Sequence, residues 1–306
     1  MTKGERAATG ASIAAVLALA AVLAAWALAL PVPGLWGAPA TRIALGPATA
    51  YDLPQISGGE GGAALPLVML DPGHGGFDPG ARTPAMDEKD LTLGLALALR
   101  EQLLAEGGVR VAMTRENDRF VALSERAEAA RRLGAALMLS IHADSAGTES
   151  ARAGEVAGAS IYTLSARASD AAARRFAARE NAADRVNGQS LAGHSDAVSA
   201  ILVDLAQRRT QAQSERFADL IAEAGRGRIA FHPKPRRSAA LEVLRAPDVP
   251  SVLFESGYIT NAADAARLAS PEGRAEFARV MARAIRLYFA SEASAASPIA
   301  SSSPAP

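Results

Sequence analysis

Short apolar runs alternate with longer amphipathic segments between residues 67 and 290, and this alternation restricts the fold more than any other feature of the chain. The first run, 67–70, lies between Pro66 and Asp71 and predicts a buried strand. A leucine at every fourth position from Leu91 to Leu103, followed by two glycines, predicts a helix over about 88–106. Further strands are expected at 109–113, 137–141, 160–164, 241–244 and 251–254, and further helices at about 123–133 and 271–290. Together these segments predict an α/β layer architecture.

Composition narrows the possible functions. Apolar residues make up 49% of the 306 residues, but aromatic residues make up only 5%, which suits helices packed on a modest sheet. The 32 basic and 32 acidic residues cancel, so no nucleic-acid partner is expected. The chain has no cysteine, which excludes disulfides and thiolate metal sites. Any metal must therefore be held by carboxylates or by the four histidines.

The N-terminal region has the pattern of an export signal. Lys3 and Arg6 precede an uncharged stretch whose core, 11–30, is almost entirely apolar. Residues 1–40 are expected to be either a signal peptide, cleaved near Ala38-Pro39-Ala40, or a retained membrane anchor, and the sequence leaves both open. Residues 41–65 are expected to be a linker, 66–290 the folded domain, and the Ser/Ala/Pro-rich residues 291–306 a disordered tail.

Four chemically capable residues lie at or near strand ends. His74 follows the first expected strand, His142 ends the third, Glu255 ends the last, and Glu88 opens the helix after the first strand. Sites in open α/β sheets form beyond the carboxyl ends of strands, so we expect the four side chains to converge. A hydrolytic zinc site needs three protein ligands and one open position, and His74, Glu88 and His142 supply such a set.

Glu255 follows an apolar run, and the desolvation there favours its protonated form and a role in proton transfer. Asp144, or another nearby acceptor, is a weaker candidate for orienting a histidine. Taken singly, each residue also has a structural interpretation, such as a loop histidine or a salt-bridge carboxylate, and spacing alone does not decide between them. His194 and His232 are interpreted as solvated or structural.

Four ordered motifs resemble the third family of N-acetylmuramoyl-L-alanine amidases. They are Leu70-Asp71-Pro72-Gly73-His74-Gly75-Gly76-Phe77-Asp78-Pro79-Gly80-Ala81 with Glu88-Lys89-Asp90-Leu91, then Thr114-Arg115 with Leu123 and Arg126, then Ser140-Ile141-His142-Ala143-Asp144, and last the block from Val243 to Asn261. With the six expected strands, the resemblance implies a central mixed, mainly parallel sheet of about six strands flanked by helices. It also implies Zn²⁺ bound at His74, Glu88 and His142, with Glu255 as the catalytic residue.

The resemblance implies a peptidoglycan hydrolase that cuts the amide between N-acetylmuramic acid and L-alanine during cell-wall remodelling and daughter-cell separation. Its location would be periplasmic or otherwise extracytoplasmic, with the inner membrane contacted only through an uncleaved N-terminal segment. Only about 25 residues separate that segment from the first strand, so the β-rich targeting domain common in division-associated members is not expected. Two rival functions stay open: a zinc peptidase acting on stem peptides, and a non-catalytic cell-wall-binding regulator.

Residues 165–225 form a helical insertion that resembles the regulatory segment of division-associated amidases. A helix capped by Ser169 is expected to run to about Val186, and a second helix to start near Asp196. By this resemblance Glu180 is a possible autoinhibitory ligand that occupies the open metal position until an activator protein displaces the helix. The alternative is that Glu180 lies on a solvated, arginine-rich helix face.

Overall fold

The computed structural model describes residues 52–59, 65–146, 153–183, 185–186, 189–190 and 200–296. The expected export segment and His194 lie outside the described residues, as do most of the expected linker and the last ten residues of the tail. Among the described helices, none is both long and apolar enough to cross a membrane.

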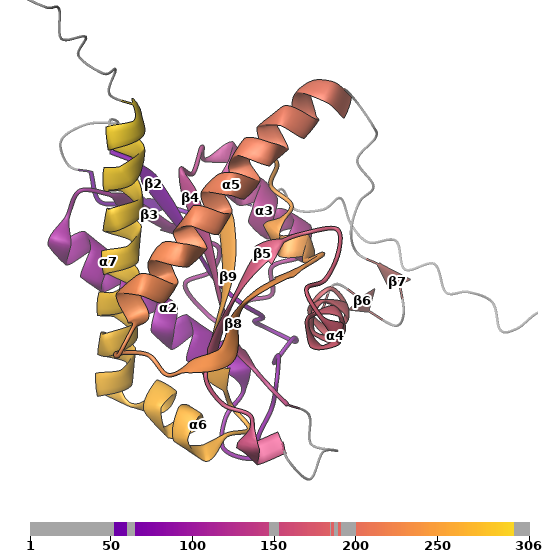
Figure 1. Ribbon diagram of the computed structural model, residues 1–306. Helices are drawn as coiled ribbons and strands as arrows, with labels where there is room; N and C mark the ends of the chain where they lie inside the picture. Colours follow the sequence, from indigo (N-terminus) through magenta and orange to yellow (C-terminus); the bar gives the residue numbers. More distant parts are fainter. Residues whose placement is uncertain are drawn as a thin grey trace, which may run out of the picture. The chain divides into compact units, whose positions relative to one another are not determined.

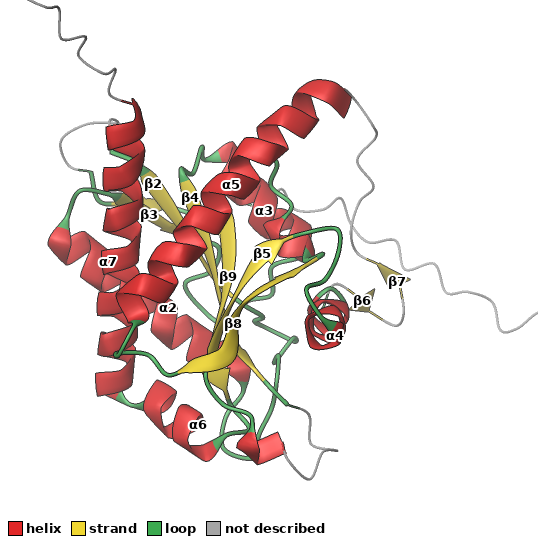
Figure 2. Cartoon of the chain, in the orientation of Figure 1, coloured by secondary structure: helices red, strands yellow, loops and turns green. Residues whose placement is uncertain are grey.

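A seven-stranded mixed sheet forms the centre of the described part of the chain, in the order β1-β3-β2-β4-β9-β5-β8 (Figures 1 and 2). The four strands β3, β2, β4 and β9 run parallel to one another, β1 pairs antiparallel with β3, and β5 pairs antiparallel with β9 and parallel with β8. The prediction of a mixed, mainly parallel α/β sheet is confirmed. The strands are β1 (Ile56–Ser57), β2 (Leu67–Pro72), β3 (Arg110–Met113), β4 (Leu137–Asp144), β5 (Ala159–Leu164), β8 (Phe231–Ala239) and β9 (Ser251–Tyr258).

Six described helices and a short 3₁₀ segment flank the sheet. They are α2 (Glu88–Glu106), α3 (Leu123–Arg132), α4 (Ala171–Glu180), α5 (Ala200–Gly225), the 3₁₀ helix η2 (Glu242–Leu244), α6 (Ala262–Ala269) and α7 (Pro271–Ala296). Two smaller elements complete the described chain: the 3₁₀ helix η1 (Ala153–Glu155) and a separate hairpin of β6 (Arg185–Val186) and β7 (Gln189–Ser190).

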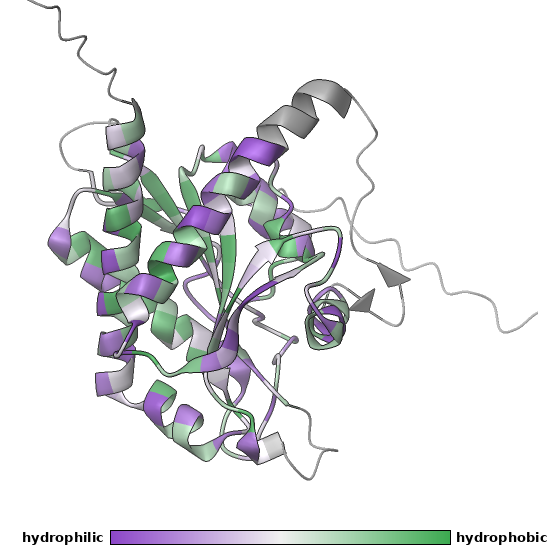
Figure 3. Ribbon diagram, viewed as in Figure 1, coloured by the Kyte–Doolittle hydropathy of each residue, from purple (hydrophilic) through white to green (hydrophobic). Residues whose placement is uncertain are grey.

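The two faces of the sheet follow from strand alternation. Val68 and Leu70 of β2 pack in one cluster with apolar side chains of α2, α5 and α7, whereas Leu67 and Met69 pack in another with α3, α4 and η2. We call these the three-helix face and the short-helix face. Figure 3 shows the central strands as largely hydrophobic and the helices as alternating between hydrophobic and hydrophilic residues, the pattern of helices that bury one side.

Chain direction places a crevice between β2 and β4. From β2 the chain passes through α2 to β3 on one side of the sheet order, then returns through α3 to β4 on the other side of β2. The two connecting helices pack on opposite faces of the sheet. In open α/β sheets, such a reversal leaves a ligand-binding crevice at the carboxyl ends of the two strands.

Two strand assignments from the sequence were wrong. The segment expected as a strand at 241–244 contains η2, whereas the unpredicted strand β8 includes Pro233 and Pro235. Proline cannot donate a ladder hydrogen bond and normally argues against a strand, but β8 is the edge strand of the sheet, where an unpaired backbone is tolerated. Its register with β5 also shifts between Ala159 and Ile161, which accommodates this irregular stretch.

Several boundaries also differ from expectation. The linker contains β1, and α7 runs to Ala296, because the stretch after residue 290 is rich enough in alanine to continue the helix. The expected helix over 169–186 ends at Glu180, and its N-cap is Asp170, whose carboxylate accepts from the Ala173 amide. The Ser169 hydroxyl instead accepts a hydrogen bond from the Ser238 amide on β8.

Candidate metal centre

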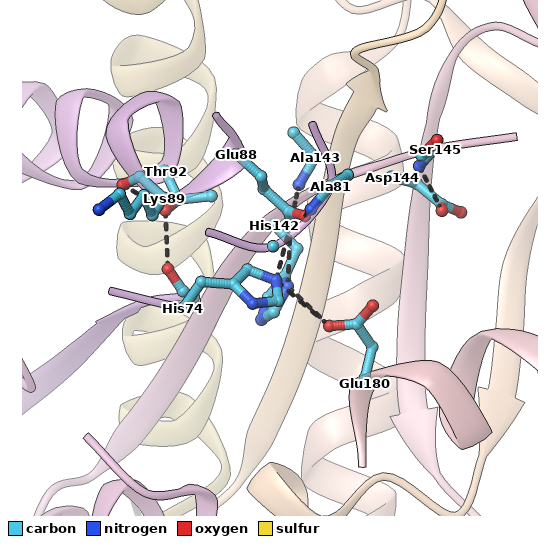
Figure 4. Close-up of polar contacts among 12 residues, drawn as sticks. His74, Ala81, Glu88, Lys89, Thr92, His142, Ala143, Asp144, Ser145 and Glu180 are labelled. Atoms are coloured by element: carbon cyan, nitrogen blue, oxygen red, sulfur yellow. Dashed lines mark hydrogen bonds and ion pairs between the residues drawn. The ribbon is translucent and has the colours of Figure 1, made fainter. Parts of the chain in front are cut away.

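Two histidines and two glutamates converge at the crevice beyond β2 and β4 (Figure 4). His74 Nε2 lies 3.2 Å from Glu88 Oε1 and 3.4 Å from Glu180 Oε2. His142 Nδ1 lies 3.1 Å from the same Glu88 oxygen and 3.3 Å from the same Glu180 oxygen. The two imidazole rings meet edge to face with their centroids 4.8 Å apart. Residues more than 100 positions apart in the sequence therefore present four ligand atoms to one point.

Four of the six separations among these atoms fit a tetrahedral metal ion. Zinc bonds to histidine nitrogen and carboxylate oxygen at about 2.0–2.1 Å, so the edges of its coordination tetrahedron measure about 3.3–3.4 Å. The four separations given above lie within a few tenths of an ångström of that value. His74 Nε2 is also buried without a hydrogen-bond partner among the described atoms, which is unusual for a buried polar atom unless it binds an ion. His74, His142 and Glu180 by themselves form a candidate metal-binding group.

The loop after β2 brings His74 into place through an unusual backbone conformation. His74 has φ of 60°, and among the described residues it is the one non-glycine with positive φ. This conformation is sterically costly for a residue with a Cβ, and it occurs mainly where the surroundings enforce it. Gly73 and Gly80 leave room for the ligands: a Cβ on Gly73 would lie 2.5 Å from the His142 ring, and one on Gly80 would lie 2.6 Å from His74.

Two buried arginines hold the loop through its carbonyl groups. Arg126 donates to the carbonyl oxygens of Pro72 and His74, at 2.7 and 2.8 Å. Arg115 donates to the carbonyl oxygens of Pro72 and Gly73, at 3.0 and 2.8 Å. Burial is the largest influence on Arg115 and, with the neighbouring Arg126 charge, lowers its pKa to about 10. Both guanidinium groups therefore hold the backbone of the loop rather than the side chains of the candidate metal ligands.

A buried carboxylate on β2 completes this anchoring network. Asp71 accepts from Arg126 at 2.7 Å, from Thr114 at 2.6 Å and from Ser140 at 2.7 Å. Burial alone would raise the pKa of Asp71, but the Arg126 charge and the hydroxyl donors outweigh it and hold the pKa below its usual range. Asp71 thus stays ionised and ties β2, β3, β4 and α3 together beneath the loop.

His74 is oriented by Asp78 rather than by Asp144. The second ring nitrogen, Nδ1, lies 2.8 Å from Asp78 Oδ2, the arrangement that usually fixes a metal-binding imidazole. Asp144 instead accepts a hydrogen bond from Arg179 of α4 at 2.5 Å and from the Ser145 amide. The sequence interpretation of Asp144 as the orienting acceptor was therefore wrong, although it allowed for another nearby acceptor.

Charge in the cluster keeps the two glutamates ionised. Burial raises the pKa of Glu88, but the His74 charge and the close contacts with both histidines outweigh it and lower the pKa to about 2. The same balance holds the pKa of Glu180 well below its usual range, through its close contacts with His142 and His74. Glu88 is further fixed by the Ala81 and Ala143 amides, which donate to its two oxygens at 2.8 and 2.9 Å. Ionised carboxylates are the ligand form.

Glu255 lies beside the cluster in a contrasting environment. Its strand partner in the β4–β9 register is His142, and the side chain is 1% exposed. Neither carboxyl oxygen has a hydrogen-bond partner among the described residues. Burial first, then the negative charges of Asp144, Glu88 and Glu180, raise the pKa of Glu255 well above its usual range. One site therefore combines carboxylates held ionised with one that favours its proton.

Helix α4 covers the cluster through contacts at three points. Glu180, the last residue of the helix, reaches the two histidines, and the neighbouring Arg179 pairs with Asp144. Phe176 stacks on Tyr162 of β5, with centroids 4.4 Å apart. Asn181 donates to the Ala240 carbonyl at 2.8 Å and accepts from the Glu242 amide at 2.9 Å. The helix is thus fastened to the sheet and to the segment that follows β8.

The residues that the sequence indicated lie close together, but the residues that support them were not predicted. His74, Glu88, His142 and Glu180 lie together as expected, with Glu255 on the adjacent strand. His232 contacts Arg237 and the Lys234 amide, outside the cluster, as expected for a structural residue. The roles of Arg115, Arg126 and Asp78 were missed. For Asp78 a signal existed, because it follows His74 by four residues within a glycine-rich turn.

Comparisons with known proteins place these residues in a shared domain. A family profile described as N-acetylmuramoyl-L-alanine amidase (Amidase_3) matches residues 68–286, a range that includes every candidate site residue. The N-acetylmuramoyl-L-alanine amidase AmiA of Salmonella typhimurium is 37% identical over 225 residues, which cover 73% of this chain and 76% of that protein. AmiC of Neisseria meningitidis serogroup B is 36% identical over 238 residues, covering 77% of this chain and 55% of that protein. Among solved structures, the amidase AmiC2 of Nostoc punctiforme has a TM-score of 0.54 at 27% identity, covering 74% of this chain and 97% of that one.

Proposed function

Because the chain belongs to the Amidase_3 family of N-acetylmuramoyl-L-alanine amidases, we propose that it hydrolyses the amide between the lactyl group of N-acetylmuramic acid and L-alanine in peptidoglycan, with zinc as its cofactor. The cluster of four ligand atoms at tetrahedral spacing carries this proposal. His74 Nε2, His142 Nδ1 and Glu88 Oε1 would hold the ion, and Glu180 Oε2 would take the fourth position. When bound, zinc would supply the Lewis acidity that makes water a nucleophile near neutral pH.

Glu255 would move the proton that the reaction requires. Hydrolysis adds a water oxygen to the carbonyl carbon and breaks the carbon–nitrogen bond, so the leaving nitrogen must gain a proton. A buried carboxyl with a raised pKa and no hydrogen-bond partner among the described residues is a strong base in its ionised form, so it can take a proton from water and then deliver it to that nitrogen. His142, the neighbour of Glu255 across the β4–β9 pair, would keep this proton transfer next to the ion.

Helix α4 would act as an autoinhibitory lock. Glu180 Oε2 lies within 3.4 Å of both histidines, so with zinc bound it would take the position that an active hydrolytic site leaves to water. The contacts of Arg179, Phe176 and Asn181 support the same closed arrangement without contributing ligands. An activator protein would therefore have to displace α4 before water and substrate could enter.

The proposed substrate determines the cellular location in which the enzyme would work. Peptidoglycan lies outside the cytoplasmic membrane, so the enzyme would work in the periplasm or another extracytoplasmic space. Residues 1–40 would serve as the export signal or as an inner-membrane anchor. There it would contribute to cell-wall remodelling and to the separation of daughter cells.

Glu255→Gln tests the proposed chemistry. The full-length wild type and variant are assayed for bound zinc by elemental analysis and for cleavage of purified sacculi by mass spectrometry of the products. The comparison is made with and without Glu180→Ala, because a closed lock would lower the starting rate. We expect Glu255→Gln to retain zinc and to lose cleavage by about 10²- to 10⁴-fold, the usual contribution of a general acid–base. Glu128→Gln, on the exposed side of α3, is the matched control.

The products and the metal content each decide a separate point. Intact stem peptides that begin with L-alanine, together with peptide-free glycan, are the expected products. Stem peptides cut internally would identify a peptidase instead. Full activity in Glu255→Gln would remove its proposed role, and zinc-free protein with full activity would refute the metal site.

A further inference from the structure

A pocket of about 320 Å³ lies beside the metal-ligand cluster, between α4 and the sheet. This volume falls in the usual range for small-ligand sites, about 300–1,000 Å³. Its lining from the sheet side includes Asp144, Tyr162, Arg237 and Tyr258, and from α4 it includes Phe176 and Arg179. The first four residues belong to strands β4, β5, β8 and β9, so this wall would persist if α4 moved away.

Residues that line the pocket follow Glu255 and His142 in the strand register. In the register of β4 and β9, His142 pairs with Glu255, and the next recorded pair is Asp144 with Tyr258, both of which line the pocket. Tyr162 lies on β5, the other neighbour of β9, and burial followed by the Glu255 charge raises the pKa of its hydroxyl. By strand order, Glu255 of β9 therefore stands between His142 of β4 and the pocket residues of β5 and β8.

The direction of the reaction decides which part of a substrate meets the pocket. In the proposed function, Glu255 delivers a proton to the leaving nitrogen, and every atom beyond that nitrogen belongs to the peptide. The peptide must therefore extend from the ion past Glu255. L-alanine has no free carboxylate of its own, since its carboxyl group forms the next amide bond. Any free carboxylate met by the pocket comes from a later residue of the stem.

Arg237 has the chemistry to bind such a carboxylate. It is 8% exposed, and its guanidinium contacts the Lys234 carbonyl at 3.2 Å and His232 Nδ1 at 3.0 Å. Within the described residues no carboxylate pairs with it, although a buried charge is costly without a counter-ion. Its neighbour Arg236 differs, because it pairs with Glu215 and Asp219 of α5.

We infer that this pocket is the stem-peptide subsite of the proposed amidase and that Arg237 binds a free carboxylate on a residue beyond L-alanine; the inference rests on the proposed function. A guanidinium presents paired donors that match a carboxylate and discriminate against a neutral amide. Tyr162 and Tyr258 line the same space. In the closed state described here, Phe176 and Arg179 cover the subsite. A molecule can therefore cleave its substrate only after α4 has moved and the peptide has entered the subsite.

The test compares two soluble substrates that differ at one group. Both are synthetic N-acetylmuramoyl-L-alanyl peptides; in one the residue after L-alanine carries a free carboxylate, and in the other a carboxamide. The full-length chain with Glu180→Ala serves as the reference, and kcat/KM is measured for both substrates. We expect at least about a tenfold preference for the carboxylate, as sites built for a specific polar group show against an analogue lacking it. Adding Arg237→Met should bring the ratio of the two kcat/KM values close to one, while the carboxamide substrate is still cleaved.

Arg236→Met is the matched control, on the same strand and paired with α5 instead of lining the pocket. The carboxylate preference should survive it. Arg237→Lys should retain part of the preference, because lysine keeps the positive charge but lacks the paired donors of the guanidinium group. A preference unchanged by Arg237→Met, or equal losses on both substrates, would overturn the inference and leave the amidase proposal standing. No cleavage of either muramoyl–alanine bond by any variant would overturn both.

Discussion

Three long helices, α2, α5 and α7, cover one face of the sheet, whereas the described elements on the opposite face are the shorter α3, η2 and α4 (Figure 1). The three-helix face buries continuous apolar stripes, including Leu95 and Leu99 of α2 and Phe277 of α7. His142 and Glu255 alternate with its residues Ile141 and Phe254, so they point to the short-helix face. The two faces therefore differ in role. The three-helix face contributes most of the buried core, whereas the short-helix face carries the candidate site beneath α4, a helix that can open locally.

The largest expected effect comes from a glycine-to-alanine substitution at the candidate site, compared with the same substitution on α2. Gly73→Ala would put a Cβ 2.5 Å from the His142 ring, so the ligand must move. We expect loss of bound zinc and at least about a 10³-fold loss of activity, since ligand geometry tolerates little displacement. Gly94→Ala on α2 would meet only Arg274 at 3.5 Å and should stabilise the helix by about 0.5–1 kcal/mol. Zinc content and thermal unfolding check both, and a zinc-loaded Gly73→Ala variant would contradict the first.

Two phenylalanines sharpen the comparison in stability. Phe277 is 2% exposed and packs near Phe254 on the three-helix face, so Phe277→Ala should cost about 3–5 kcal/mol in the free energy of unfolding. Phe176 of α4 is similarly buried at 4%, but α4 can open locally. Phe176→Ala should cost less than about 2 kcal/mol and raise basal activity. Urea unfolding and sacculus digestion measure the two effects. Equal costs would show that α4 belongs to the global core.

Removing the locking carboxylate should raise activity at little cost in stability. Glu180→Ala is expected to increase sacculus digestion by at least about tenfold, because the fourth ligand position becomes available to water. Arg174→Ala, on the exposed side of the same helix, should change nothing. Unchanged or lower activity in a folded, zinc-loaded Glu180→Ala protein would argue against the lock. Deletion of residues 169–190 offers a second route to the same result.

The smallest expected effect is a pH-dependent change in the free energy of unfolding, caused by Asp71 beneath the site. The folded-state pKa of Asp71 is held below its unfolded value, so its contribution to stability is present above the unfolded pKa, about 3.9, and is lost as pH falls through the folded pKa. Ser140→Ala removes one donor to Asp71 and should cost about 1 kcal/mol at neutral pH, with the difference vanishing in acid.

A neighbouring serine provides the control for that titration. Ser160 on β5 is equally buried, but its hydroxyl has no hydrogen-bond partner among the described residues. Ser160→Ala should therefore have a small effect that does not depend on pH. Free energies of unfolding between pH 2 and 7 compare the two variants, and a pH-independent loss in Ser140→Ala would remove Asp71 from the explanation.

The sequence could predict whatever depends on local pattern. Apolar runs located the central strands, and His74 and His142 could be expected to meet because parallel strands end at a common edge of the sheet. The anchoring role of Arg115 could not be predicted, since arginine is normally exposed and the loop carbonyls that it binds, those of Pro72 and Gly73, lie more than 40 positions away. Strand β8 was missed for a related reason: its edge position, a tertiary property, is what makes its prolines acceptable.

The attachments at the two ends of α4 restrict how this segment can change in length. Ser169 bonds to Ser238 before the helix, and Asn181 bonds to Ala240 and Glu242 directly after it. Each residue added within the helix would turn Glu180 by about 100° and move it about 1.5 Å along the axis. Insertions and deletions should therefore accumulate outside these two attachment points, and the spacing from residue 169 to residue 181 should stay constant in any relative that uses the same lock.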